Sequence, residues 1–170
     1  MTRVPSDLTT ILLALQNKLI TDGIFRDTAC WLSLTPELGQ DQLGKMPAES
    51  VALIYPMAMP IEQPVVTGGG NETMLVDEGA VQLILYSRIV LDQTLRSTDL
   101  LTKPTIGLLS LLKCCIASWS MFDPTREDGN LILSEPLRPR QIDAPSLTPA
   151  GWGRLSSTWR LSFTQEISCP

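Results

Sequence analysis

The sequence predicts an α+β domain in which a mostly antiparallel β-sheet carries two main helices. Residues 79–92, GAVQLILYSRIVLD, are apolar on both alternating faces at their centre, which is typical of a strand inside a sheet. Residues 104–121 repeat apolar side chains at steps of three and four, which indicates a helix packed on that sheet. Residues 154–167 alternate between apolar and polar, which indicates a strand with one dry and one wet face.

The first half of the chain predicts a helix followed by two strands. The helix is capped by Ser6 or Asp7 and ends near Gly23, because its leucines recur at helical spacing and glycine is a natural stop. Two short apolar runs, residues 28–34 and 51–57, are bounded by prolines and predict strands.

The second half completes the predicted order of elements, α-β-β-β-α-β-β. A further strand is expected at residues 131–137, before the closing strand. Long loops are expected between these elements at residues 37–50, 58–78 and 138–150, with two alternatives left open: a mobile hairpin within residues 58–78 and brief strand pairing of RQI at residues 140–142. A chain of 170 residues is enough for one domain with a real core, so we expect a single domain over residues 1–170.

Side-chain periodicity also predicts which faces are buried. In the central strand, one face carries Val81, Leu83 and Leu85, and the other carries Ile84 and Tyr86. In the second helix the expected buried stripe consists of Ile106, Leu109, Leu112, Ile116 and Trp119, widened by Leu108 and Cys115.

The composition excludes several classes of function. Only 18% of the residues are charged and the net charge is −5, which argues against a general nucleic-acid binder. The absence of histidine removes the commonest general base and metal ligand, and the four cysteines form no CxxC pair. We therefore expect no cofactor, no metal site and no catalytic residues. No apolar run is long enough to span a bilayer, so no membrane partner is expected.

One motif resembles a nucleotide-binding loop and fails its other requirements. Residues 39–46, GQDQLGKM, match GxxxxGK, but Met46 follows where serine or threonine must hold magnesium, and Asp41 would repel a phosphate. These residues are interpreted as an exposed loop.

Charge is distributed unevenly along the chain. Between Met46 and Ser87 there are five acids and no base: Glu49, Glu62, Glu72, Asp77 and Glu78. Between residues 138 and 160 there are four arginines and one acid, the arginines being Arg138, Arg140, Arg154 and Arg160. Two interpretations are open: ordinary scatter of surface charge, or complementary patches on neighbouring subunits of an assembly.

Several features together resemble the tail terminator and neck proteins of tailed bacteriophages. An N-terminal helix is followed by a PVVTGGG loop at residues 64–70, a long strand ending in RIVLD, and a second helix. An LILSEPLRPRQIDAP segment, a Gly151-Trp152 pair and a closing WRLSFTQEI strand then complete the chain. The resemblance lies in the order and spacing of elements over most of the chain and includes no catalytic motif.

The resemblance implies a non-enzymatic structural protein of the virion, assembled in the host cytoplasm. Its implied fold is an α+β subunit whose sheet joins its neighbours in a homo-oligomeric ring, usually a hexamer. The ring would cap the tail tube and present a surface to the head connector, and DNA would pass through it without specific binding. Another head–tail joining protein, such as a head-closure or tail-completion subunit, is the close alternative. A small-molecule-binding or enzymatic domain that uses Asp92 and Asp99 is an alternative from a different class.

For the acidic loop at residues 62–78, the ring hypothesis allows two roles. The loop lines the channel and repels DNA phosphates, or it contacts the arginines of a neighbouring subunit. We expect the channel, because a glycine-rich tip is costly to order at an interface.

Overall fold

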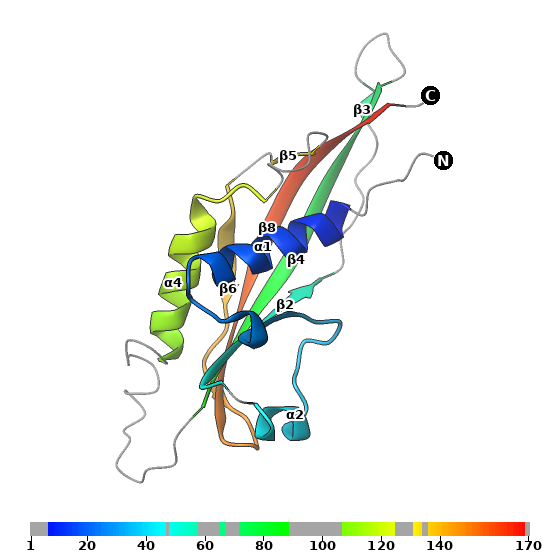
Figure 1. Cartoon of the computed structure of the whole chain (residues 1–170). Helices are drawn as coiled ribbons and strands as arrows, with labels where there is room; N and C mark the ends of the chain where they lie inside the picture. Colours follow the sequence, from blue (N-terminus) through cyan, green and yellow to red (C-terminus); the bar gives the residue numbers. More distant parts are fainter. Residues whose placement is uncertain are drawn as a thin grey trace.

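The central strand, β4 (Glu72–Arg88), lies inside the sheet, as its sequence predicts. The computed structural model describes residues 7–46, 48–57, 65–66, 72–88, 107–124, 131–133 and 136–168. Within these ranges, β4 is antiparallel to β2 (Ser50–Pro56) on one side and to β8 (Trp152–Ser168) on the other. The β4–β8 pairing extends from Glu72 opposite Ser168 to Arg88 opposite Trp152, so the two strands form the long axis of the molecule (Figure 1).

The sheet has two different edges. One edge is β1 (Cys30–Leu32), which is parallel to β2 and follows a short 3-10 helix, Asp27–Ala29. The other edge consists of three short strands that are all antiparallel to β8: β5 (Leu131–Leu133), β6 (Arg138–Ile142) and β7 (Ser146–Leu147). A two-residue strand, β3 (Val65–Val66), pairs with the start of β4. Every pairing among the described strands except β1–β2 is antiparallel, so the predicted α+β class with a mostly antiparallel sheet is confirmed.

Two helices, α1 (Asp7–Thr21) and α4 (Leu108–Ser120), cover one face of the sheet (Figure 1). The predicted stripe of α1 is confirmed where the side chains are described, since the buried residues are Ile11, Leu12, Leu15 and Leu19. Gly23 follows the helix at φ 71°, a backbone angle that strains other residues, so glycine ends α1 as expected. On the sheet, Val81, Leu83 and Leu85 face these helices.

The buried side of α4 differs in part from the prediction. Leu108, Leu112, Cys115 and Trp119 are buried as expected, and Ile116 is partly buried against the same core. Leu109 was predicted to be buried but is 37% exposed, and Leu111 takes its place at 5% exposure. Helix α4 has leucine at four of its first five positions, so the spacing of apolar residues alone does not decide which side of the helix faces the sheet. The expected start of this helix at Pro104 lies outside the described residues.

A second core on the opposite face corrects the predicted loop at residues 37–50. Residues 40–44 form a short helix, α2 (Gln40–Gly44), and Leu43 is only 2% exposed. Leu43 packs in a cluster with Ile84 and Tyr86, the two residues predicted for the second face of β4. The segment that resembles a nucleotide-binding loop is therefore a short helix that packs on this face through Leu43, so the loop interpretation is wrong, whereas the expected exposure is confirmed for residues 39–42, 44 and 45.

The other two predicted loops contain strands. Strand β4 begins at Glu72, before the expected start at Gly79, because the equally long β8 supplies backbone partners for residues 72–78. Within residues 138–150, β6 and β7 pair with β8 even though Pro139 lies in β6. Proline is tolerated in this position because β6 is an edge strand, and the register shifts between Pro139 and Gln141.

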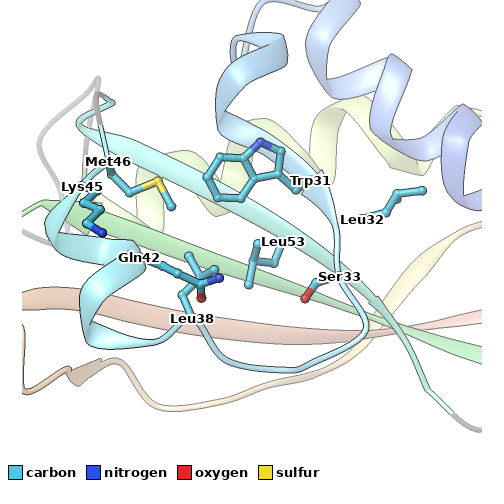
Figure 2. Close-up of a pocket in the computed structure, with 8 residues that line it drawn as sticks. All are labelled: Trp31, Leu32, Ser33, Leu38, Gln42, Lys45, Met46 and Leu53. Atoms are coloured by element: carbon cyan, nitrogen blue, oxygen red, sulfur yellow. The ribbon is translucent and has the colours of Figure 1, made fainter.

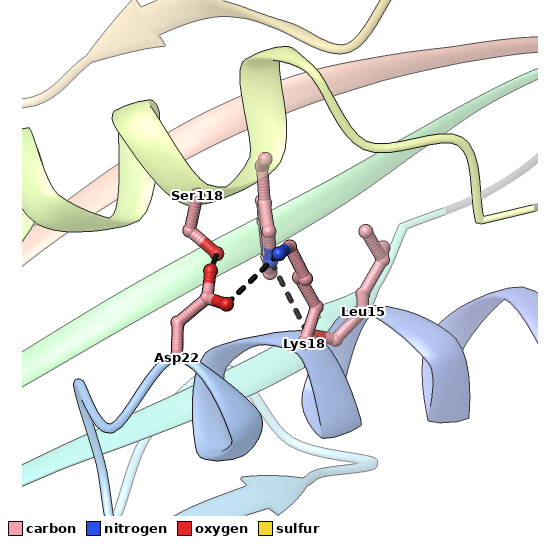
Figure 3. Close-up of polar contacts among 5 residues, drawn as sticks. Leu15, Lys18, Asp22 and Ser118 are labelled. Carbon is pink, nitrogen blue, oxygen red and sulfur yellow. Dashed lines mark hydrogen bonds and ion pairs between the residues drawn. The ribbon is translucent and has the colours of Figure 1, made fainter.

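Polar contacts join the two helices beside their apolar contact (Figure 3). Asp22, just after α1, accepts hydrogen bonds from Lys18 Nζ at 2.8 Å and from Ser118 Oγ of α4 at 2.6 Å. These two donors hold the pKa of Asp22 below its usual range, with the Lys18 bond contributing most. Trp119 Nε1 of α4 also donates to the carbonyl oxygen of Leu15 at 3.2 Å, so α4 is fixed to α1 at two points.

We expect the Asp22→Asn variant to be less stable than the wild type by under about 1 kcal/mol at pH 7, since the contact is at the surface. A lowered folded-state pKa gives a stabilisation that is present above the unfolded pKa, about 3.9, and is lost as pH falls through the folded value. Denaturant unfolding of both proteins at pH 7 and at about pH 2.5 checks this. A difference in stability that is unchanged or larger in acid would contradict it.

Candidate interaction surface

The structure places the candidate interface residues on three strands. Glu72, Asp77 and Glu78 belong to β4 rather than to a loop, and Glu62 lies outside the described residues. Arg138 and Arg140 belong to β6, whereas Arg154 and Arg160 belong to β8. The reason given for a channel role, a glycine-rich tip, therefore does not apply to residues 72–78, because they are paired in the sheet.

The register brings two of the arginines together. Arg138 of β6 lies directly opposite Arg160 of β8. Like charges in directly opposite positions are unfavourable in a sheet. Arg138 and Arg140 are exposed at the edge, while Arg160 is partly buried inside the sheet. We call β6, with its two exposed arginines, the arginine edge.

Arg154 has an intramolecular role. It is partly buried, and its Nη2 donates to the carbonyl oxygen of Pro36 at 3.4 Å, which ties the loop after β1 to β8. Its charge is also close enough to Asp143 to lower the pKa of that carboxyl group. Of the four arginines between residues 138 and 160, Arg154 is therefore not part of the exposed arginine edge.

Asp143 is the single acid between Arg138 and Arg160, and its carboxylate is already occupied. Ser156 Oγ and Gln141 Nε2 both donate to it, the latter at 2.7 Å, and its own backbone N–H donates to the Ser156 carbonyl oxygen at 2.9 Å. The Ser156 hydroxyl and then the Gln141 amide hold the pKa of Asp143 below its usual range. This contact fixes the turn after β6. It could not be found from the sequence, because Ser156 lies thirteen positions away.

The acidic residues lie on the outer half of the long strand pair. We call residues 72–79 of β4 and 162–168 of β8 the acidic ribbon. It contains Glu72, Asp77, Glu78 and Glu166 and no lysine or arginine. Glu78 pairs with Ser162, two pairs along from the Ala80–Arg160 pair, so the ribbon begins where the arginine cluster ends.

An open apolar cavity lies between β1 and the α2 segment, on the face opposite α1 and α4 (Figure 2). Its volume is about 530 Å³, and its lining residues are Trp31, Leu32, Ser33, Leu38, Gln42, Lys45, Met46 and Leu53. Leu34, the residue after Ser33 in the sequence, is 91% exposed. Sequence reasoning missed the cavity, although Leu38, Leu43 and Met46 were an apolar signal within the predicted loop.

A second open cavity, of about 900 Å³, lies beside the end of α1. It is lined by the residues that follow the helix and by Ala48, Glu49 and Ser50. The charged residues Arg26, Asp27 and Glu49 in this lining are all exposed. The cavity thus offers solvated charges rather than a desolvated catalytic group.

The described residues contain no group of three histidine, cysteine, aspartate or glutamate side chains that could hold a metal ion. Cys30, Cys114 and Cys115 are free thiols, and burial raises the pKa of Cys30 to about 12. Cys30 is therefore protonated at neutral pH and is a poor nucleophile. None of the described helices is long and apolar enough to cross a membrane.

No family model matches the chain, and no curated protein is a significant match.

Proposed function

We propose that this protein is a structural subunit that assembles into a closed ring at the end of a bacteriophage tail. In this role it caps the tail tube and contacts the head connector. The proposal combines the resemblance in element order with the long central strand pair of the sheet. A hexamer is the expected form, because it is the usual ring of the proteins that the chain resembles.

The observation that carries the proposal is the length of the β4–β8 pair relative to the helices that cover it. Figure 1 shows the two strands running past α1 and α4 toward β3. Among the side chains that the structure describes, the helices pack in one apolar cluster with Val81, Leu83, Leu85, Leu155, Trp159 and Leu161 of this pair.

Among the described residues, the strands that flank the outer part of this pair are short: β3 has two residues and β5 has three. A neighbouring copy of the same chain is a simple source of further packing, and only 18% of the residues are charged, which favours a subunit interface.

The net charge of −5 suits a ring through which DNA passes without binding. Phosphate groups are repelled by an acidic surface, so the duplex slides rather than adheres. The virion, after assembly in the host cytoplasm, is the corresponding location.

A capping assay tests the function. The purified full-length chain is added to the tail-tube protein of the same phage while the tubes polymerise. We expect ring-shaped density at one end of each tube and a halt in tube growth, seen by negative-stain electron microscopy.

Two other outcomes of this assay are informative. Binding to isolated head connectors but not to tubes would identify the protein as a head-closure or tail-completion subunit instead. A protein that binds neither structure, and that remains a monomer, would contradict the proposal.

A further inference from the structure

We infer that the open cavity between β1 and α2 is a docking site for an extended, acidic segment of a partner protein, which adds to the edge of the sheet at β1. The cavity has a volume of about 530 Å³, which is within the range of sites that bind a ligand group. The inference goes beyond the proposed ring and does not depend on it, because it uses only the cavity and edge strand of one chain.

The cavity has an apolar lining that is only partly covered (Figure 2). Leu53 of β2 is buried in it, whereas Trp31, Leu38 and Met46 pack against the second core and keep part of their surface exposed. Tryptophan at a partly exposed, apolar site is the residue type that most often dominates binding energy. The lining therefore suits a large apolar side chain of an occupant.

The cavity also carries one positive charge. Of its described lining residues only Lys45 is charged, and the structure gives the Lys45 side chain no ion pair or hydrogen bond with the described residues. Glu37 and Asp41 lie in the same segment and are exposed, but neither lines the cavity. An ammonium group beside an apolar surface favours an occupant that carries a carboxylate.

The other polar groups of the lining also have a defined state. Gln42 Oε1 accepts a hydrogen bond from the Gly39 N–H at 3.0 Å, which leaves the amide Nε2 as the donor. Ser33 Oγ donates to the Thr35 carbonyl oxygen at 2.7 Å, so its hydrogen is already used. The cavity thus offers donors from Lys45 and Gln42, which suit carboxylates and backbone carbonyl groups.

Strand β1, which borders the cavity, has an open edge at Leu32. The Ser33 N–H donates to the Ile54 carbonyl oxygen at 3.0 Å, so the backbone groups of Leu32, one residue earlier, point away from β2. The Leu32 N–H and C=O have no hydrogen-bond partner among the described residues. Gln16 Nε2 donates to the Cys30 carbonyl oxygen at 2.6 Å, so the start of this edge is closed and the edge is open from Leu32 onward.

A strand added at Leu32 places its side chains beside the cavity. It continues the sheet, so its residues on the cavity face lie next to Trp31, and Leu34, which is 91% exposed, lies just beyond. The open edge is short, so an apolar anchor in the cavity and a carboxylate near Lys45 supply most of the affinity. The occupant is therefore an extended segment with large apolar residues at alternate positions, followed or preceded by acidic residues.

Titration of the full-length, fluorotryptophan-labelled protein with synthetic peptides tests this site. The peptides alternate phenylalanine and leucine with threonine and carry two glutamates before or after the apolar pair, so both strand directions are covered. We expect the fluorine signal of Trp31 to shift on binding. The signals of the buried Trp119, Trp152 and Trp159 serve as internal references and should not shift. Calorimetry on the same samples gives the dissociation constants.

Two variants and a matched control locate the contact. We expect Lys45→Glu to weaken binding by about tenfold and Trp31→Ala by about thirtyfold or more. Lysine in place of the peptide glutamates should weaken binding to the wild type and recover binding to Lys45→Glu. Lys113→Glu changes an exposed lysine of α4, on the opposite face of the sheet, and should bind like the wild type. Circular dichroism confirms that each variant is folded.

Four results would contradict the inference. Peptides that leave the Trp31 signal unchanged, or that bind no better than their lysine counterparts, would overturn the site. Equal binding of a peptide methylated at its backbone nitrogens would overturn strand addition. Equal affinity for phenylacetate would show a site for small aromatic acids rather than for a protein segment. A Trp31 signal that moves with protein concentration alone, but not in Lys45→Glu, would make a second copy of this chain the occupant.

Discussion

Replacing Trp119 with alanine is expected to lower the free energy of unfolding by about 3–5 kcal/mol. Trp119 is fully buried between the helices and the sheet. Its ring meets that of Trp159 edge-to-face, with centroids 5.0 Å apart and an angle of 74° between the planes. Its Nε1 also donates to the Leu15 carbonyl oxygen, so one substitution removes contacts with α1 and β8 together. Denaturant unfolding followed by circular dichroism measures the loss.

Leu109→Ala is the matched control on the same helix. Leu109 is 37% exposed, so its loss should cost well under the value for Trp119, at about 1 kcal/mol or less. Equal effects at the two positions would show that α4 does not present Trp119 to the sheet as described.

Leu43→Ala is expected to cost about 2–5 kcal/mol, although Leu43 lies in a helix of five residues. Leu43 is the buried residue through which α2 contacts the second face of the sheet, beside Ile84, Tyr86 and Trp152. The adjoining hydrogen bond from Leu38 N–H to Tyr86 Oη, at 3.2 Å, holds the same segment from its other end. Thermal unfolding of the variant and wild type checks the loss.

Lys45→Ala provides the control for this segment, because Lys45 is exposed and next to α2. Its substitution should change the free energy of unfolding by less than about 0.5 kcal/mol. If Leu43→Ala were equally mild, the second core would not contribute to stability and the original loop interpretation would be restored.

The elements with strong local patterns could be predicted from the sequence. Strand β4 carries apolar residues on both faces, and both faces are covered, by α1 and α4 on one side and by α2 on the other. Leu155, Trp159 and Leu161 on β8 are buried on one face, as their alternation predicts. On the expected wet face Arg154, Thr158 and Arg160 are partly exposed, while Ser156 is buried and bonded to Asp143.

The errors arose where long-range pairing decides the structure. Residues 72–78 are polar and follow a glycine run, so their own sequence favours a loop, but β8 provides a partner along their whole length. Strand β6 contains Pro139, which locally argues against a strand, yet it pairs at an edge where the missing N–H is harmless. Helix α2 has only five residues, which is too few to show the spacing of apolar side chains that indicates a helix.

The candidate surface was predicted as two clusters of charge, and the fold changes what those clusters can do. Four arginines close in sequence divide into an exposed pair on β6 and a partly buried pair on β8. The acids at residues 72–78 become part of a strand rather than of a mobile loop. Whether each charged residue lies in a strand or in a loop depends on which strand pairs with its segment. These pairing partners are far away in sequence, so local patterns do not reveal them.

The mass of the assembled protein tests the central claim most directly. Native mass spectrometry of the purified full-length chain should give one dominant species that is an integer multiple of 18.7 kDa, with the hexamer expected. Negative-stain images of the same sample should show closed rings with a central channel. A single species of 18.7 kDa across the micromolar range would contradict the ring, and with it the proposed function.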